Sequence, residues 1–204
     1  MNELERDLAR FYDQQAPVRE ARAVPTERQR DRDLFAGVLM DENRSVLVDV
    51  GAGAGHDGAA LRQNGFTVVA VDLSTASSKL CRAKGLFALA GSGRDLPLHD
   101  HSFDAAYSMS TLLHMPDVVF KRAMEEMVRV VRPGSPVAIG VWGGVDLETT
   151  QRDDTFEPRR QYWYRSDEAL QSLLTPHGAI EQFHTWESSL DDLHYQFCIL
   201  RTPS

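Results

Sequence analysis

Cysteine is almost absent from this sequence, and its scarcity excludes several classes of protein. Cys81 and Cys198 are the only two cysteines among 204 residues. Two isolated thiols cannot build a disulfide framework, and neither lies at the spacing of a zinc site. We therefore expect buried or unused thiols, a reducing compartment and a cytoplasmic location.

Long apolar runs are missing as well. Acidic and basic residues interrupt the segment from Glu3 to Asp7, so we expect no signal peptide there. No stretch of the chain reaches the roughly 20 apolar residues that a membrane span needs. We therefore expect no membrane partner.

The sequence also lacks a basic block. Its formal net charge is -8, and the arginines between Arg19 and Arg32 alternate with acids, as on a solvated helix face. Because a nucleic-acid site needs clustered positive charge, we disfavour nucleic acid as a partner and expect this stretch to lie at the surface. The length fits one compact domain, as a monomer or a homodimer.

Apolar patterning indicates an α/β fold. Residues 3–15 and 26–41 show helical spacing, and Val46–Val50 is an apolar run that stops at a glycine cluster, as a buried parallel strand does. Further strands are expected at 67–71, 87–90, 104–109, 137–141, 179–185 and 193–200, and further helices at 56–64, 75–84, 118–131 and 166–174, with a polar loop at 143–160. This alternation predicts a seven-stranded, mostly parallel sheet with helices on both faces.

The glycine cluster follows the first strand as Asp49-Val-Gly51-Ala-Gly53-Ala-Gly55. Glycines at such a turn let the backbone approach a ligand closely, and the helix that follows offers free N–H groups to an anion. Asp72 ends the second strand, at the roughly 20-residue offset at which an acid hydrogen-bonds ribose hydroxyls. Together these features predict an adenosine-type ligand. A dinucleotide fingerprint would place its third glycine at His56, so the spacing disfavours a nicotinamide oxidoreductase.

Further segments occur in the order that a known family shows. They are Ser92–Pro97, Ser102–Asp104, Leu113–Asp117 and Arg129–Gly134. With the glycine turn, they make residues 45–142 resemble the class I S-adenosylmethionine-dependent methyltransferases. The C-terminal part is similar to a bacterial subgroup of uncharacterised methyltransferases at Trp142–Gly144, Glu148, Asp153, Asp154, Pro158–Arg160 and Leu193–Gln196.

This resemblance implies a Rossmann-like fold with an N-terminal helical lid, and S-adenosylmethionine as cofactor with S-adenosylhomocysteine as product. It divides the single domain 1–204 into a helical cap at 1–42, a cofactor-binding core at 45–142 and substrate-side elements at 143–204. It implies that Asp72 binds ribose and Leu73 packs on adenine, while Ser92 stands where an aspartate commonly contacts the adenine amino group. The implied cofactor-binding residues are Tyr12, Asp49, Gly51, Ala52, Gly53, Gly55, Asp72, Leu73, Ser92, Gly93, Arg94 and Met109.

Catalysis would need mainly alignment, because the donor sulfonium is already reactive. His114, just beyond the fourth strand, is the candidate base for a hydroxyl or ammonium acceptor. Tyr12 has two interpretations, packing on the sheet or covering the cofactor's methionine end. His99 and His101 have no further ligands at metal spacing, so we expect no metal. Aromatic and basic residues after the fifth strand would suit a planar or anionic acceptor, namely Trp142, Arg159, Arg160, Tyr162, Trp163 and Tyr164.

The predicted function is methyl transfer to oxygen or nitrogen of a small-molecule acceptor, which the sequence does not identify. Two alternatives stay open. The segment from Phe103 to Trp142 also resembles enzymes that modify wobble uridines of tRNA, which the acidic charge disfavours. The other alternative is a protein that binds S-adenosylmethionine without transferring its methyl group, and Ser92 is the residue that points to it.

Overall fold

Seven strands form the central sheet of this computed structural model, which describes residues 1–150, 154, 156–187 and 193–204. The strand order is β3-β2-β1-β4-β5-β9-β8. Strands β1 to β5 run parallel, whereas β9 is antiparallel to β5, and β8 to β9. The bounds are β1 Val46–Val50, β2 Thr67–Asp72, β3 Phe87–Ala90, β4 Ala105–Met109, β5 Pro136–Gly143, β8 Ala179–Glu187 and β9 His194–Arg201. The predicted seven-stranded, mostly parallel sheet is confirmed.

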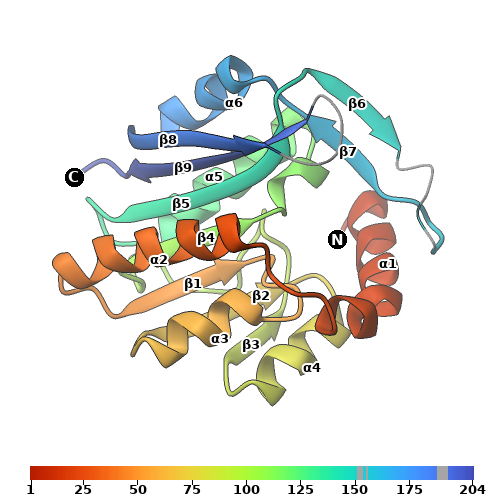
Figure 1. Ribbon diagram of the computed structural model, residues 1–204, viewed down its shortest axis with the longest axis horizontal. Helices are drawn as coiled ribbons and strands as arrows, with labels where there is room; N and C mark the ends of the chain where they lie inside the picture. The colour runs from red at the N-terminus through yellow and green to blue at the C-terminus, as the bar shows by residue number, and fades with distance from the viewer. Residues whose placement is uncertain (151–153, 155, 188–192) are drawn as a thin grey trace.

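Helices cover both faces of this sheet, as predicted (Figure 1). On one face α5 and α6 pack through Phe120 and Leu170, and on the other α2 and α3 pack through Phe35 and Leu61. The bounds are α1 Glu3–Glu20, α2 Thr26–Asp41, α3 His56–Gln63, α4 Thr75–Ala83, α5 Asp117–Val130 and α6 Asp167–Leu174, with short 3-10 turns η1 Leu112–His114 and η2 Thr175–His177.

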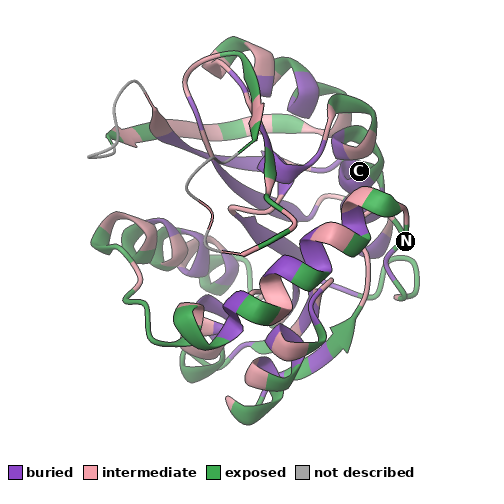
Figure 2. Ribbon diagram, turned by 90° about the vertical axis from the view of Figure 1, so that its right-hand side faces the viewer, coloured by how far each residue is buried: buried purple, intermediate pink, exposed green. Residues whose placement is uncertain are grey.

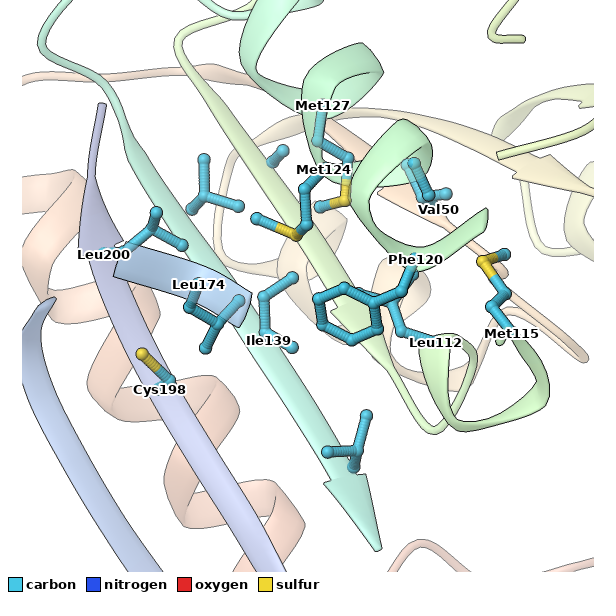
Figure 3. Packing of buried hydrophobic residues seen from close by; sticks show 14 of the residues in the cluster. Val50, Leu112, Met115, Phe120, Met124, Met127, Ile139, Leu174, Cys198 and Leu200 are labelled. Carbon is cyan, nitrogen blue, oxygen red and sulfur yellow. The ribbon is translucent and has the colours of Figure 1, made fainter. Parts of the chain in front are cut away.

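The apolar core reaches the segment that follows β4. Figure 3 shows the ring of Phe120 between Ile139 of β5 and Leu112 of η1, and all three side chains are fully buried. Burying each of them stabilises the fold by about 1.5–3 kcal/mol. Because Leu112 lies two residues before His114, this packing fixes the position of His114 at the edge of the sheet.

Helix α1 lies across the edge to which the carboxyl ends of the parallel strands point. Figure 2 looks onto this edge and shows α1 crossing in front of it. Asp13 anchors the helix there, because its Oδ1 accepts hydrogen bonds from Ser74 Oγ at 2.6 Å and from the Ala76 N–H at 2.9 Å, just beyond β2. The predicted N-terminal helical lid is therefore present in α1, whereas α2 packs on a sheet face.

The basic stretch expected at the surface is partly buried, so that prediction is wrong for some of its residues. Asp31 of α2 is 3% exposed. It accepts hydrogen bonds from Nε2 of His184 at 2.7 Å and from Nε1 of Trp186 at 2.9 Å, both on β8. Charge alternation along α2 did not reveal these partners, because β8 lies about 150 residues further along the chain.

The loop expected at 143–160 is also wrong in part. Strand β6 (Leu147–Thr150) lies within it and pairs antiparallel with β7 (Gln161–Tyr164), in a separate two-stranded sheet. Four-residue strands of mixed polarity have no periodicity that distinguishes them from a loop. Asp153, which contributed to the resemblance, lies outside the described residues.

Candidate active site

The turn after β1 contains three glycines with positive φ. Gly51, Gly53 and Gly55 have φ of 76°, 54° and 77°, values that cost a residue with a Cβ about 1–2 kcal/mol. A Cβ on Gly51 would lie 1.9 Å from Thr111 Oγ1, so only glycine fits there. A Cβ on Gly53 would meet nothing within 4 Å. The middle of the turn therefore offers bare backbone to open space.

Asp72 holds this turn from the end of β2. Its Oδ2 accepts a hydrogen bond from the Gly53 N–H at 2.8 Å, and its Oδ1 accepts one from the Ser74 N–H at 2.8 Å. Burial raises the pKa of this carboxyl. Within the described part of the chain, each oxygen accepts one hydrogen bond, which leaves capacity for ligand hydroxyls. Ala52 and Leu73 are half-buried beside these groups.

Asp49 lies in β1 just before the turn. It is 3% exposed, and burial, followed by the nearby charge of Asp57, raises its pKa to about 8. Asp57 forms an ion pair with Arg28, whose Nε donates to Asp57 Oδ2 at 2.7 Å. Arg28 also donates to Ser110 Oγ at 3.3 Å, beyond β4. Arg28 could not be predicted from the sequence, because α2 is brought to the glycine turn only by tertiary packing.

The loop after β3 carries Ser92, Gly93 and Arg94, and it meets an acid that sequence analysis also missed. Ser92 Oγ and Arg94 Nε both donate to Oε1 of Glu5 in α1, the latter at 2.9 Å. Burial raises the pKa of Glu5, but hydrogen bonds from Ser92 and Asn2 and the charge of Arg94 outweigh it and lower the pKa overall. In the sequence, the position of Glu5 is typical of a helix-capping residue. Glu5 does form a capping box with Asn2 in the structure, in addition to its contacts with Ser92 and Arg94.

Met109 ends β4 with its side chain in the core. It is 3% exposed, and its sulfur accepts a hydrogen bond from the Tyr195 hydroxyl at 3.6 Å. The cofactor contact that the resemblance implies for Met109 would therefore come from its backbone. Gly55 is likewise buried, and a Cβ added there would lie 2.9 Å from Cys81 Sγ.

Tyr12 and His114 meet although 102 positions separate them. The Tyr12 hydroxyl lies 2.6 Å from His114 Nε2. His114 Nδ1 lies 2.9 Å from the carbonyl oxygen of Gln161, which can only accept a hydrogen bond. Nδ1 therefore carries the proton, and Nε2 accepts from Tyr12. Burial lowers the pKa of His114 to about 3, so its ring is neutral at pH 7.

Two guanidinium groups flank this pair. Arg19 lies 4.8 Å from the centre of the Tyr12 ring. Arg160 pairs with the buried Asp154, to whose Oδ2 its Nε donates at 3.0 Å. It also lies over the rings of Phe11, Tyr162 and Tyr12, at 4.5, 5.3 and 5.8 Å. The surroundings of the Tyr12–His114 pair are therefore aromatic and positively charged, as suits a planar acceptor.

A recess of about 300 Å³ opens between α1 and the segment that leads into β7. Its size is at the lower end of the range for small-molecule sites. It is lined by Glu3, Leu4, Asp7, Leu8, Pro158, Arg159, Arg160 and Gln161. Trp163 and Tyr164 line a separate recess of about 320 Å³, and the Trp142 ring packs 4.9 Å from that of Tyr195. The structure thus brings only part of the predicted acceptor set toward His114.

These residues fit an adenosyl cofactor. The glycine turn leaves open space over Gly53, and the Asp72 carboxylate has capacity for hydroxyls beside it. The turn follows β1, where the strand order reverses between β1 and β4 and open α/β sheets bind ligands, and Asp72 contacts it from the neighbouring β2. Among the described residues, no three histidine, cysteine or acidic side chains gather as metal ligands. Within the same part of the chain, no helix is both long and apolar enough to cross a bilayer.

Comparison with known proteins identifies relatives of this chain. A family model described as a methyltransferase domain matches residues 48–139. The tRNA (carboxymethyluridine(34)-5-O)-methyltransferase of Arabidopsis thaliana is 36% identical over 107 residues, which cover 52% of this chain and 26% of that protein. O-methyltransferase resE of Aspergillus sclerotiorum is 32% identical over 130 residues, 59% of this chain and 47% of that protein. This chain thus spans less than half the length of both curated relatives.

A solved structure shares the fold. The 1,6-didemethyltoxoflavin-N1-methyltransferase of Burkholderia thailandensis, with bound 1,6-didemethyltoxoflavin and S-adenosylhomocysteine, superposes with a TM-score of 0.68 at 21% identity. The match covers 85% of this chain and 79% of that chain. Fold, site and family model agree: residues 48–139 match a methyltransferase domain, and the sheet has the Rossmann-like fold of S-adenosylmethionine-dependent methyltransferases.

Proposed function

We propose that this chain transfers the methyl group of S-adenosylmethionine to an oxygen or nitrogen atom of a small planar acceptor. When bound, the cofactor supplies a methyl carbon on a positively charged sulfur. The observation that carries this proposal is the Tyr12–His114 hydrogen bond. It sets a polar pair beside aromatic rings and cations, at the same edge of the sheet as the glycine turn and Asp72.

For the cofactor, we assign the sugar hydroxyls to Asp72 and the amino-acid end to the backbone at Gly51–Gly53. Arg19 adds a cation that sequence analysis missed. Its backbone oxygen lies 3.2 Å from His56 Nε2, at the start of α3, and its guanidinium covers Tyr12. The Arg19 guanidinium therefore lies between the glycine turn and His114. A cofactor carboxylate bound at the turn would gain a charge-assisted hydrogen bond from it.

For the acceptor, we assign His114 the role of hydrogen-bond acceptor and base. Its neutral Nε2 would align an acceptor hydroxyl or N–H that takes the place of the Tyr12 hydroxyl. Because burial lowers its pKa to about 3, the neutral ring orients the acceptor through Nε2 and would hold the displaced proton only until the product leaves and water enters the site. Arg160 and the Tyr162 ring provide the flat, cationic wall for the acceptor.

The test is release of S-adenosylhomocysteine from the purified chain with a panel of phenols, aromatic carboxylic acids and nitrogen heterocycles. His114→Ala is expected to lower kcat by about 100-fold or more. His99→Ala removes an exposed histidine and serves as the matched control. Equal activity of the His114 and His99 variants would contradict the assigned role of His114. A release that no acceptor stimulates would contradict methyl transfer to these classes.

A tRNA substrate is the second candidate, favoured by the name of the Arabidopsis thaliana relative. The net charge of -8 works against it, because tRNA binding depends on clustered cations. Binding of tRNA that weakens steeply with rising salt would favour this candidate. A protein that only binds the cofactor is the third, and acceptor-dependent S-adenosylhomocysteine release would eliminate it. A cytoplasmic location, a single domain over 1–204 and a monomeric or homodimeric state stay predictions.

A further inference from the structure

Helix α1 is anchored to all four loops that follow the first four parallel strands. Each loop makes polar contact with a different residue of the helix. The contacts are Arg19 O with His56 after β1, Asp13 with Ser74 and Ala76 after β2, Glu5 with Ser92 and Arg94 after β3, and Tyr12 with His114 after β4. A ligand held between these loops therefore lies under α1 and within reach of its side chains.

Glu5 is the acid that α1 places over the loop after β3. It is 6% exposed, which is unusual for a glutamate and requires that its charge be compensated. Its Oε1 accepts hydrogen bonds from Ser92 and Arg94, whereas its Oε2 accepts one, from the Asn2 N–H at 2.9 Å. Since a carboxylate oxygen can accept two, Oε2 keeps capacity for one more donor.

The base of the cofactor is directed toward this loop, an inference that rests on the proposed function. Asp72 would hold the sugar, and the polar pair that faces the methyl group lies on the β4 side of it. The base then extends the other way, toward β3, which is the neighbour of β2 away from β1. The Gly91 N–H donates to the Asp72 backbone oxygen at 2.9 Å, so the loop that holds Ser92 begins next to the sugar site.

We propose that Glu5 is a specificity residue for the cofactor, accepting a hydrogen bond from the 6-amino group of adenine through Oε2. The amino group is a donor without charge, and a buried carboxylate is a strong acceptor for it. Glu5 is a better acceptor for this amino group than either neighbour. The Arg94 side chain has donors only, and the Ser92 hydroxyl is uncharged and already accepts a hydrogen bond from the Arg94 N–H at 3.2 Å.

The experiment compares two ligands by calorimetry, S-adenosylhomocysteine and its analogue with hydrogen in place of the 6-amino group. The wild-type chain is expected to bind the analogue about 10- to 100-fold more weakly, because the amino donor is lost. In Glu5→Ala the two ligands are expected to bind within about 3-fold of each other. Glu20→Ala is the matched control, since it removes another α1 anchor, the ion pair with Lys84 at 2.5 Å, far from the adenine loop. It is expected to keep the wild-type ratio.

Each result bears on the inference. Equal affinity of the wild-type chain for the two ligands overturns it without any variant, and so does a wild-type ratio in Glu5→Ala. A reduced ratio in Glu20→Ala as well would show that loosening of α1, rather than a contact from Glu5, sets the preference. Failure of the wild-type chain to bind S-adenosylhomocysteine at all would instead overturn the proposed function, and this inference with it.

Discussion

The two sides of the candidate site are built in different ways. On the cofactor side, the glycine turn and the end of β2, contacts run between neighbouring backbone segments, such as the Gly51 N–H to Val71 O at 2.7 Å. On the cover side, formed by α1 and β7, they run between side chains far apart in the sequence, such as Tyr12 and His114. Local residue spacing thus specifies the cofactor side, whereas the cover side depends on where whole elements are placed.

The largest effect is expected on the cofactor side, from Gly51→Ala. The new Cβ would lie 1.9 Å from Thr111 Oγ1 at a φ of 76°, so we expect a loss of about 3–5 kcal/mol in the free energy of unfolding. Gly65→Ala is the control, because Gly65 has a φ of 96° but open space around its Cβ position. It should lose only about 1–2 kcal/mol in urea unfolding. Equal losses would show that Thr111 moves aside at no cost.

The next effect concerns the cover side, where His114 should make stability depend on pH. Its pKa is lowered from 6.5 to about 3 on folding. Between these values the unfolded chain binds more protons than the folded one, so this contribution is complete above pH 6.5 and is lost as the pH falls toward 3. Relative to His114→Gln, the wild-type chain should lose about 2–3 kcal/mol between pH 7 and pH 4.5 in urea unfolding. Parallel pH profiles would exclude a buried neutral imidazole.

Asp72→Ala tests the cofactor side for ligand binding rather than stability. Loss of a charge-assisted hydrogen bond should weaken S-adenosylhomocysteine binding by about 1–3 kcal/mol in calorimetry. Asp33→Ala removes an exposed acid of α2 and should bind the ligand as the wild type does. Unchanged affinity of the Asp72 variant would remove the sugar from this position.

The smallest effect is expected outside the site, at Asp31. This residue tests whether side-chain pairing between distant parts of the sequence also stabilises the fold there, as it does on the cover side. Asp31→Asn replaces one acceptor by a donor facing His184 or Trp186, and it should cost about 1–2 kcal/mol in thermal or urea unfolding. Asp33→Asn, two residues away and exposed, should cost less than about 0.5 kcal/mol. Similar small costs would mean that the buried position of Asp31 contributes little.

Most of the fold was predictable, because a buried parallel strand such as Val46–Val50 and an amphipathic helix such as α5 have clear periodicities. The expected boundaries lie within about two residues of those observed, except that α1 continues to Glu20 instead of ending at residue 15. The strands β6 and β7 escaped prediction, since they are short and pair with each other away from the main sheet. Asp31 was wrongly assigned to the surface for a related reason. Its partners lie on β8, far along the chain, and no local sequence pattern indicates them.

The sequence by itself determined the glycine turn, Asp72 and the alternation of parallel strands and helices that places them at one edge. Backbone conformation and βα connections depend on residues that are neighbours along the chain, so the local sequence is enough to predict them. Only the tertiary structure decided that Glu5 meets Arg94, that Arg160 lies over Tyr162, and that the imidazole of His114 is neutral. Desolvation and side-chain pairing arise from residues that packing brings together, and packing depends on the whole chain at once.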